Sequence, residues 1–345
     1  MASDFNVAFA SRSVMINPLP ISYILPIAAS SSQARALTGY LCRLSRVVDE
    51  VIVVDGSPDS LFRAHAHAWA HHVRHMPPKT LTQNGKVGNV ITGVLAARNE
   101  NVVIADDDVR YRRDELLRLS GLLGRFDVVR PQNWFHPLPW HARWDSARIL
   151  LNRVLDGDWP GTLALRRSRF LAAGGYAGDV LFENLELVRT IEAVGGREMV
   201  ARDLFVVRRP PTAAHFWRQR VRQAYDELAR PSRFVAQLAI LPTVLTLLER
   251  RRINALTTMA VASIVAAEVG RRRDGARKVF PASSALWAPA WIGERAVTAW
   301  LALCESLVCG GVRYRSGRLK RSATPRAELN AQFLPTIQSF AGERT

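Results

Sequence analysis

The sequence contains few cysteines, only three among its 345 residues: Cys42, Cys304 and Cys309. Their spacing fits neither a zinc site nor a disulfide framework, which excludes a metal-stapled module and a disulfide-rich scaffold. We expect three small, buried side chains in a reducing compartment. The start of the chain also lacks a basic segment followed by a long apolar core. We therefore expect no secretory signal and a main folded part that stays in the cytoplasm.

Acidic residues are also scarce, because 30 Asp and Glu stand against 47 Lys and Arg and give a net charge of +17. Nucleic acid and anionic lipid headgroups are the usual partners of such a charge. The arginines gather beside apolar segments, at residues 250–252, 271–273 and 313–321. That placement favours a lipid surface. No helix-turn-helix, RNA-recognition or zinc-finger pattern occurs, so we expect no nucleic acid as a partner.

No apolar run reaches the roughly 20 residues that a membrane-spanning helix needs. The apolar segments 234–248, 253–269 and 296–309 are all shorter. If the first two crossed a bilayer, their flanking arginine triplets would lie on opposite sides of it, against the positive-inside tendency. We therefore expect a basic, apolar helical region over residues 231–345 that lies in the membrane interface or forms a re-entrant hairpin. A buried helical subdomain of a soluble protein is the alternative.

Short apolar segments alternate with helical segments over residues 20–230, after an extension over residues 1–19. Strands are expected at residues 21–27, 51–54, 101–105, 128–129 and 161–165. Helices are expected at residues 33–44, 64–75, 86–97, 113–123, 182–193 and 218–228. Such alternation predicts an α/β domain with a largely parallel sheet. In such sheets, ligands bind at the carboxyl ends of the strands.

Acidic residues follow two of these strands. Asp106, Asp107 and Asp108 come directly after the third strand, and Asp55 comes after the second, within Val-Val-Asp-Gly-Ser. Three adjacent carboxylates repel one another, and hard oxygen ligands suit Mg²⁺ or Mn²⁺, which can also hold a diphosphate. The carboxylate of Asp55 could accept hydrogen bonds from a base or ribose. The alternatives are a solvated acidic turn for the triplet and an ordinary Asp-Gly turn for Asp55.

Other segments complete a pattern around these aspartates. Gly85-Lys-Val-Gly-Asn89 precedes the triplet, and Gly161 and a Gly-Gly-Tyr turn at residues 174–176 follow it. Together the segments resemble glycosyltransferase family 2 with its GT-A fold, over residues 20–228. Within that family they are most similar to ceramide glucosyltransferase-like and polysaccharide-synthase-like members. The resemblance implies a Rossmann-like mixed sheet flanked by helices, followed here by the apolar helical membrane-associated region.

The resemblance also implies roles for single residues. Asp55 would contact the nucleobase of a nucleotide-sugar donor, and Asp106 would lie near its ribose and diphosphate. The residues that would bind the donor are Asp55, Lys86, Asn89, Asp106, Asp107 and Gln219. Asp108, with Asp106, would hold Mg²⁺ or Mn²⁺.

Two motifs depart from the family pattern. The catalytic base of the family is the aspartate of a Glu-Asp pair, but here Asn184 follows Glu183. Asparagine cannot accept a proton, so the base would be Glu183, which we favour, or Glu186 one turn later; an anionic acceptor would need neither. The second motif, Gln-x-x-Arg-Trp, is present as Gln219 and Arg222 with glutamine at residue 223. Arg222 would stabilise the leaving diphosphate. Surface glutamates and a basic solvated helix are the alternatives.

Histidines and tryptophans gather in two segments. The histidines are His65, His67, His71, His72 and His75. We expect them on one solvated helix face without a metal, because no carboxylate or cysteine accompanies them. The tryptophans Trp134, Trp140 and Trp144 could stack on a sugar, lie at a membrane interface or pack in the core.

The sequence therefore predicts an inverting, metal-dependent glycosyltransferase at the cytoplasmic face of a membrane. The donor would be a UDP- or GDP-sugar, and the acceptor a lipid, a lipid-linked molecule or a saccharide. Attachment would be peripheral or monotopic, with integral spanning left open. A catalytically degenerate membrane interaction protein, a nucleotidyltransferase and a nucleic-acid-binding protein are the other hypotheses; the last explains only the charge.

Overall fold

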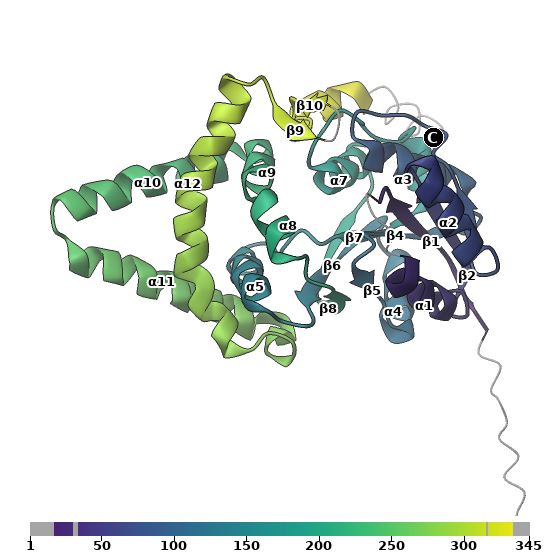
Figure 1. Ribbon diagram of the computed structural model, residues 1–345, viewed down its shortest axis with the longest axis horizontal. Coiled ribbons are helices and arrows are strands. Elements are labelled where there is room, and N and C mark those ends of the chain that lie inside the picture. Colours follow the sequence, from purple (N-terminus) through teal and green to yellow (C-terminus); the bar gives the residue numbers. More distant parts are fainter. Residues whose placement is uncertain (1–16, 30–33, 315–316, 334–345) are drawn as a thin grey trace, which may run out of the picture.

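The computed structural model describes residues 17–29, 34–314 and 317–333, so most of the predicted N-terminal extension, residues 1–16, lies outside the described residues. The centre of the molecule is an eight-stranded mixed sheet (Figure 1). Its strands, in spatial order, are β3 (Arg74–Met76), β2 (Val48–Asp55), β1 (Leu19–Ile27), β4 (Asn101–Ala105), β7 (Thr162–Arg166), β6 (Val128–Phe135), β8 (Glu198–Arg208) and β5 (Val109–Arg110).

Six of the eight strands run in one direction. β1 is parallel to β2 and β4, β2 is parallel to β3, and β6 is parallel to β8. β7 is antiparallel to both β4 and β6, and β5 is antiparallel to β8. The carboxyl ends of β1, β2 and β4 therefore meet at one edge of the sheet. Ile27 pairs with Asp55 there, next to the end of β4 at Ala105.

Helices cover both faces of the sheet. Successive side chains of β1 alternate between two cores, with Tyr23 and Leu25 in one and Ile24 in the other, as the two-residue period of a strand requires. The first core is closed by α1 (Ala34–Leu44), α2 (Asp59–Trp69) and α4 (Arg113–Leu123). The second is closed by α3 (Gly85–Ala96), α6 (Arg167–Ala172) and α7 (Glu183–Ala193). The predicted mixed α/β sheet flanked by helices is confirmed.

Several segments differ from the sequence prediction. The helix expected over residues 64–75 is α2 over Asp59–Trp69, and the chain then enters the edge strand β3. The helix expected over residues 218–228 is divided into α8 (Ala213–Arg218), α9 (Arg220–Tyr225) and the 3₁₀ turn η1 (Asp226–Ala229). The longest strand, β8, was not expected at all, because its burial pattern is irregular and charged residues interrupt it.

A second group of helices follows the sheet domain. α10 (Pro231–Glu249) and α11 (Ile253–Arg272) form a hairpin that projects away from the sheet, and α12 (Ala288–Leu307) crosses it (Figure 1). The short turns η2 (Arg273–Lys278) and η3 (Ala282–Trp287) join α11 to α12 and pack with α5 (Trp140–Asn152) in a third apolar core. This confirms the predicted apolar helices. α10 and α11 are 19 and 20 residues long, so each is longer than its apolar segment.

The chain then returns to the sheet domain. The hairpin of β9 (Val312–Tyr314) and β10 (Gly317–Leu319) leads to residues that bind the start of α7. The backbone amides of Leu181 and Phe182 donate to the carbonyls of Arg321 and Ser322, at 3.0 and 2.8 Å. Segments far apart in the sequence thus complete one part of the fold. Two of the cysteines expected to be buried, Cys304 and Cys309, are exposed, so that prediction was wrong for them.

Candidate functional site

The aspartate triplet lies where β4 ends at the carboxyl edge of the sheet. The amide of Asp106 donates to the carbonyl of Gly161 at 2.8 Å, which holds the turn against the start of β7. Gly161 leaves no room for a larger residue, because a methyl group there would overlap the Oδ2 atom of Asp106. The side chains of Asp106 and Asp108 are partly exposed, at 21% and 26%, and are accessible to a ligand.

Lys86 joins this edge to the start of α7. Its Nζ atom lies 2.5 Å from Oδ1 of Asp106 and 2.7 Å from Oε1 of Glu183. Lys86 is in the first turn of α3, where the side chain of Asn84 caps the helix by accepting from the Lys86 amide. Burial opposes the lysine charge, but the carboxylates of Asp106 and Glu183 outweigh burial and raise the pKa of Lys86. Three predicted site residues from distant segments therefore meet.

Arg208, at the end of β8, is a second cation in the site. Its Nε atom donates to Oδ2 of Asp108 at 2.8 Å, and Nη2 donates to Oδ2 of Asp106 at 3.2 Å. Sequence reasoning missed Arg208, because β8 was not expected and a lone arginine carries no motif. Burial, reinforced by Asp106, raises the pKa of Asp108 to about 6 although Arg208 opposes it. At Asp106 burial favours the neutral carboxyl, but the positive charges of Lys86 and Arg208 outweigh burial and lower the pKa of Asp106.

The carboxylates of Asp106 and Asp108 fit a divalent cation only if a bound phosphate supplies further oxygen atoms to it. Within the described ranges, no three His, Cys, Asp or Glu side chains form a group that could hold a metal alone. However, Oδ1 of Asp108 is buried and has no hydrogen-bond partner. Mg²⁺ is commonly held by one or two carboxylates and completed by substrate phosphates and water. Asp106 and Asp108 fit that arrangement.

The two candidate bases occupy different environments. Glu183 is at the start of α7 and belongs to the site through Lys86. Glu186 is fully buried, and its Oε2 atom accepts from the backbone amide of Thr324 at 2.7 Å. Asn184 donates from Nδ2 to the carbonyl of Pro160 at 2.9 Å. Glu183 is thus the glutamate that lies beside Asp106, whereas Glu186 fastens the returning chain to α7.

Arg222 faces the same site from α9. Its charge contributes to the lowered pKa of Asp106 and opposes the raised pKa of Asp226. Its guanidinium lies 5.3 Å from the ring centroid of Tyr314, whose hydroxyl donates to Oδ1 of Asn84 at 2.8 Å. Gln219 contacts His215 one turn earlier. β9 therefore lines the site beside the arginine of the predicted motif.

Asp226 is an ionisable group that the sequence did not suggest. Its Oδ1 atom is buried without a hydrogen-bond partner. Burial raises the pKa of Asp226 to about 7; Arg222 opposes this rise, and Glu183 and Glu227 add to it. No motif pointed to Asp226, because it follows the Gln-x-x-Arg segment inside a short 3₁₀ turn.

Asp55 lies at the predicted strand end, but its carboxylate is buried and already bonded. Oδ2 lies 2.7 Å from Nδ1 of His65 and 3.1 Å from Nε2 of His75, and Oδ1 accepts from the amide of Ser57 at 2.9 Å. Burial opposes ionisation, but these hydrogen bonds outweigh burial and lower the pKa of Asp55. The expected solvated histidine face without a carboxylate was wrong for His65 and His75, which both contact Asp55. His65 is 1% exposed and stacks on Trp69.

The other predicted donor residues lie around this edge. Asn89 is buried, and its Nδ2 atom donates to the carbonyls of Ile27 and Val54 at 2.8 and 3.1 Å, which ties the ends of β1 and β2 together. Asp107 is exposed between Asp106 and Asp108. Contact of Asp55, Asn89, Asp107 and Gln219 with a donor stays a prediction.

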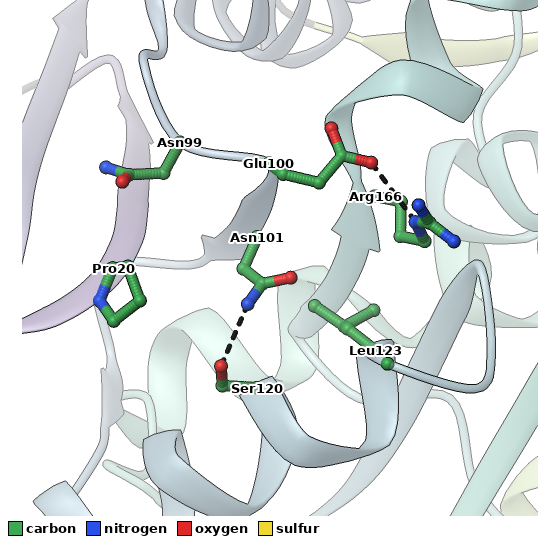
Figure 2. Close-up of a pocket in the computed structure, with 8 residues that line it drawn as sticks. Pro20, Asn99, Glu100, Asn101, Ser120, Leu123 and Arg166 are labelled. Carbon is green, nitrogen blue, oxygen red and sulfur yellow. Dashed lines mark hydrogen bonds and ion pairs between the residues drawn. The ribbon is translucent and has the colours of Figure 1, made fainter.

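A cavity of about 380 Å³ lies at the opposite edge of the sheet, near the start of β4. Figure 2 shows two pairs of its polar side chains pointing toward each other, Glu100 with Arg166 at 3.1 Å and Asn101 with Ser120 at 2.8 Å. Because these groups satisfy one another and are remote from the strand ends that carry the carboxylates, we do not assign the cavity a catalytic role.

No protein-family model and no curated protein matches the chain. Solved structures do. The mannosyltransferase PcManGT from Pyrobaculum calidifontis, in complex with GDP-Man and Mn²⁺, is 20% identical, with 85% of this chain and 90% of that chain covered and a TM-score of 0.49. TarS 1–349 of S. aureus, in complex with UDP-GlcNAc, is 15% identical over 57% of this chain and 60% of that chain, with a TM-score of 0.41.

A third similar structure is glucosyl-3-phosphoglycerate synthase from Mycobacterium tuberculosis, in complex with Mn²⁺, UDP and glucosyl-3-phosphoglycerate. It is 19% identical over 58% of this chain and 76% of that chain, with a TM-score of 0.38. These scores describe a distant likeness in fold.

Proposed function

We propose that this protein is an inverting glycosyltransferase that moves a sugar from a nucleoside-diphosphate donor. The observation that carries the proposal is the ionic cluster of Asp106, Asp108, Lys86, Glu183 and Arg208 at the carboxyl edge of the sheet. It brings two cations, two carboxylates for a divalent ion and one further carboxylate into one place. Those groups would stabilise a departing diphosphate and take a proton from an acceptor hydroxyl.

The donor diphosphate would lie against Lys86, Arg208 and Arg222. Their charges are placed to stabilise the negative charge that develops as the bond to the anomeric carbon breaks. Mg²⁺ or Mn²⁺, held by Asp106 and Asp108, would supply further neutralisation of that diphosphate. Lys86 already bridges Asp106 and Glu183, so it can hold the donor and the base in fixed relation.

Glu183 would act as the base. Its carboxylate would take the proton of the acceptor hydroxyl while that oxygen attacks the anomeric carbon from the face opposite the diphosphate. One bond forms and one breaks in the same step, so the configuration at the anomeric carbon inverts. The buried bond of Glu186 to Thr324 favours Glu183 for this role.

The acceptor would be a lipid, a lipid-linked molecule or a saccharide at the cytoplasmic face of a membrane. The exposed apolar helices after the sheet domain support this part of the proposal.

The test is calorimetric titration of the full-length protein with UDP and GDP, with and without Mn²⁺, and with Asp108→Ala as the paired variant. We expect metal-dependent binding of one diphosphate and its loss in Asp108→Ala, which should fold normally because the residue is in a polar turn. Turnover of the matching nucleotide-sugar should disappear with it. Undiminished turnover by Asp108→Ala would contradict the metal assignment.

The competing hypothesis is a catalytically degenerate interaction protein. It is favoured by Asn184, which cannot accept a proton, and by the glutamine at residue 223. A folded protein that binds no nucleoside diphosphate at any metal concentration would support it. A nucleotidyltransferase would instead release pyrophosphate from a nucleoside triphosphate, which the same preparations can test.

A further inference from the structure

The outward face of α12 is apolar, which is unusual for a helix on the surface of a protein in water. Val297, Trp300 and Leu301 are 49%, 40% and 47% exposed. The exposed residues follow helical spacing along the whole helix and its C-cap: Gly293, Val297, Trp300, Leu301, Cys304, Leu307 and Val308. No charged residue interrupts this stripe.

Two of the three charged residues of α12 point inward instead, and the third, Glu305, is 34% exposed and paired with Arg318 at 3.0 Å. Arg295 is 1% exposed and lies 5.2 Å from the ring centroid of Trp291. Glu294 lies 3.6 Å from Arg220, whose guanidinium also donates to Asp145 at 2.8 Å. Charges are rarely buried while large apolar side chains face water. This inverted polarity indicates that the outer face of α12 is not in water when the protein functions.

The α10–α11 hairpin continues the apolar surface. Residues 234–248 and 253–267 contain no charged side chain, and Leu245, Val261 and Val265 are at least half exposed. In the described part of the chain these two helices are apolar enough to cross a membrane, yet only 11% and 17% of their most apolar windows are buried. A core helix of a soluble domain would be mostly buried, so the alternative of a buried helical subdomain does not fit.

Arginines border this surface. The exposed triplet at residues 250–252 is at the tip of the hairpin, and Arg272 and Arg273 are exposed at its base (Figure 1). Trp217 and Arg218, both exposed, add an aromatic and a basic side chain at α8. Guanidinium groups bind lipid phosphates, and tryptophan favours the headgroup level of a bilayer. The charge pattern therefore complements an anionic lipid surface.

The position of α12 limits how deep the hairpin can go. α12 lies across the hairpin, and Nε1 of Trp300 donates to the carbonyl of Leu238 at 3.0 Å (Figure 1). A hairpin crossing the roughly 30 Å hydrocarbon layer would draw α12 and its buried charges in with it. A hairpin ending at the midplane would leave three arginines in hydrocarbon, which is costly for charged side chains.

We propose that α10, α11 and α12 form a monotopic membrane-binding surface. It rests at the headgroup–acyl boundary of one leaflet of an anionic bilayer, with the outer face of α12 in the acyl region and both arginine clusters on lipid phosphates. This deepens the membrane part of the proposed function, and it does not depend on glycosyl transfer.

The test is flotation of the full-length protein with preformed vesicles of phosphatidylcholine, with and without phosphatidylglycerol. Leu301→Lys and Val265→Lys should each weaken vesicle binding on the order of tenfold, because each removes a large apolar contact with the acyl region. Leu117→Lys is the matched control, since Leu117 on α4 is equally accessible at 53% exposure but lies on the sheet domain. It should bind like the native protein.

The arginines have their own prediction. Arg250→Ser and Arg252→Ser should each weaken binding to the anionic vesicles about fivefold and leave binding to phosphatidylcholine unchanged. In a variant whose three native cysteines are serines, Arg250→Cys should react with a membrane-impermeant maleimide added outside sealed vesicles. Protection of that cysteine until the vesicles are opened would show that the hairpin spans, and would overturn the monotopic assignment.

Other outcomes also overturn the proposal. Equal flotation of Leu301→Lys and the native protein would exclude the α12 face. The native protein could instead self-associate in solution. If Leu301→Lys abolished that self-association and vesicles did not compete with it, the outer face of α12 would be assigned to a second copy of the chain. Nucleotide binding by the same samples separates the two proposals, because a protein that binds UDP or GDP but not vesicles loses only the membrane assignment.

Discussion

Gly161 offers a direct perturbation of the ionic cluster. Alanine at this position would bring its methyl group into Oδ2 of Asp106 and within 3.0 Å of the Arg208 guanidinium. The carboxylate must therefore move, and it would weaken at least one of its charge-assisted hydrogen bonds to Lys86 or Arg208. Each such bond contributes about 1.5–3 kcal/mol, so we expect Gly161→Ala to weaken metal-dependent nucleotide binding by about 10- to 100-fold.

Calorimetry measures this loss, and urea unfolding measures the accompanying change in stability. Overpacking at Gly161 should lower the free energy of unfolding by about 1–3 kcal/mol. Gly121→Ala is the matched control, because Gly121 lies in α4 with nothing within 4 Å of an added methyl group. It should raise the free energy of unfolding by about 0.5–1 kcal/mol and leave nucleotide binding intact. Native-like nucleotide affinity in Gly161→Ala would refute the role assigned to the position of Asp106.

Two further predictions concern carboxyl groups near the site. Glu183→Gln should lower turnover at least about 100-fold with little change in nucleotide affinity. Glu186→Ala should mainly lower the free energy of unfolding, by about 1–3 kcal/mol, because the buried amide of Thr324 loses its acceptor. Steady-state kinetics and urea unfolding measure the two effects, and an exchange of these effects between the two variants would reverse the assignment. Asp226 keeps its proton longer in the folded than in the unfolded protein, because burial raises its pKa to about 7; the stability this supplies is present below about pH 4 and is lost as the pH rises through about 7. Asp226→Asn should therefore flatten the fall in stability between about pH 4 and pH 7, and an unchanged pH profile would show that Asp226 is already ionised.

The sheet and its carboxyl edge could be predicted because they depend on local patterns. β4 and α4 begin and end at the expected residues, since each is a short apolar or amphipathic segment with clear boundaries. The triplet at residues 106–108 therefore stands where the sequence placed it. Lys86 and Glu183 could be predicted from their motifs, but their meeting at Asp106 could not, because it depends on the packing of α3 and α7 on one face.

Other features depend on contacts between distant segments. Arg208 enters the site only because β8 pairs with β6 and β5, and the charged residues of β8 hide its strand pattern. His65 and His75 are separated by a turn between α2 and β3, so helical spacing gave a wrong face for them. The burial of Glu186 follows from residues 321–324 lying against α7, which no local pattern could indicate.

The return of the chain from the apolar helices to α7 has a consequence for the order of events during synthesis. Tyr314 and Thr324 contribute to the surroundings of the site, yet they are made after all three apolar helices. Domains usually fold as they leave the ribosome, from the N-terminus onward. Here the sheet can form early, but the start of α7 cannot gain its final contacts until α10, α11 and α12 have emerged. The newly made protein therefore presents its apolar helices before its site is complete.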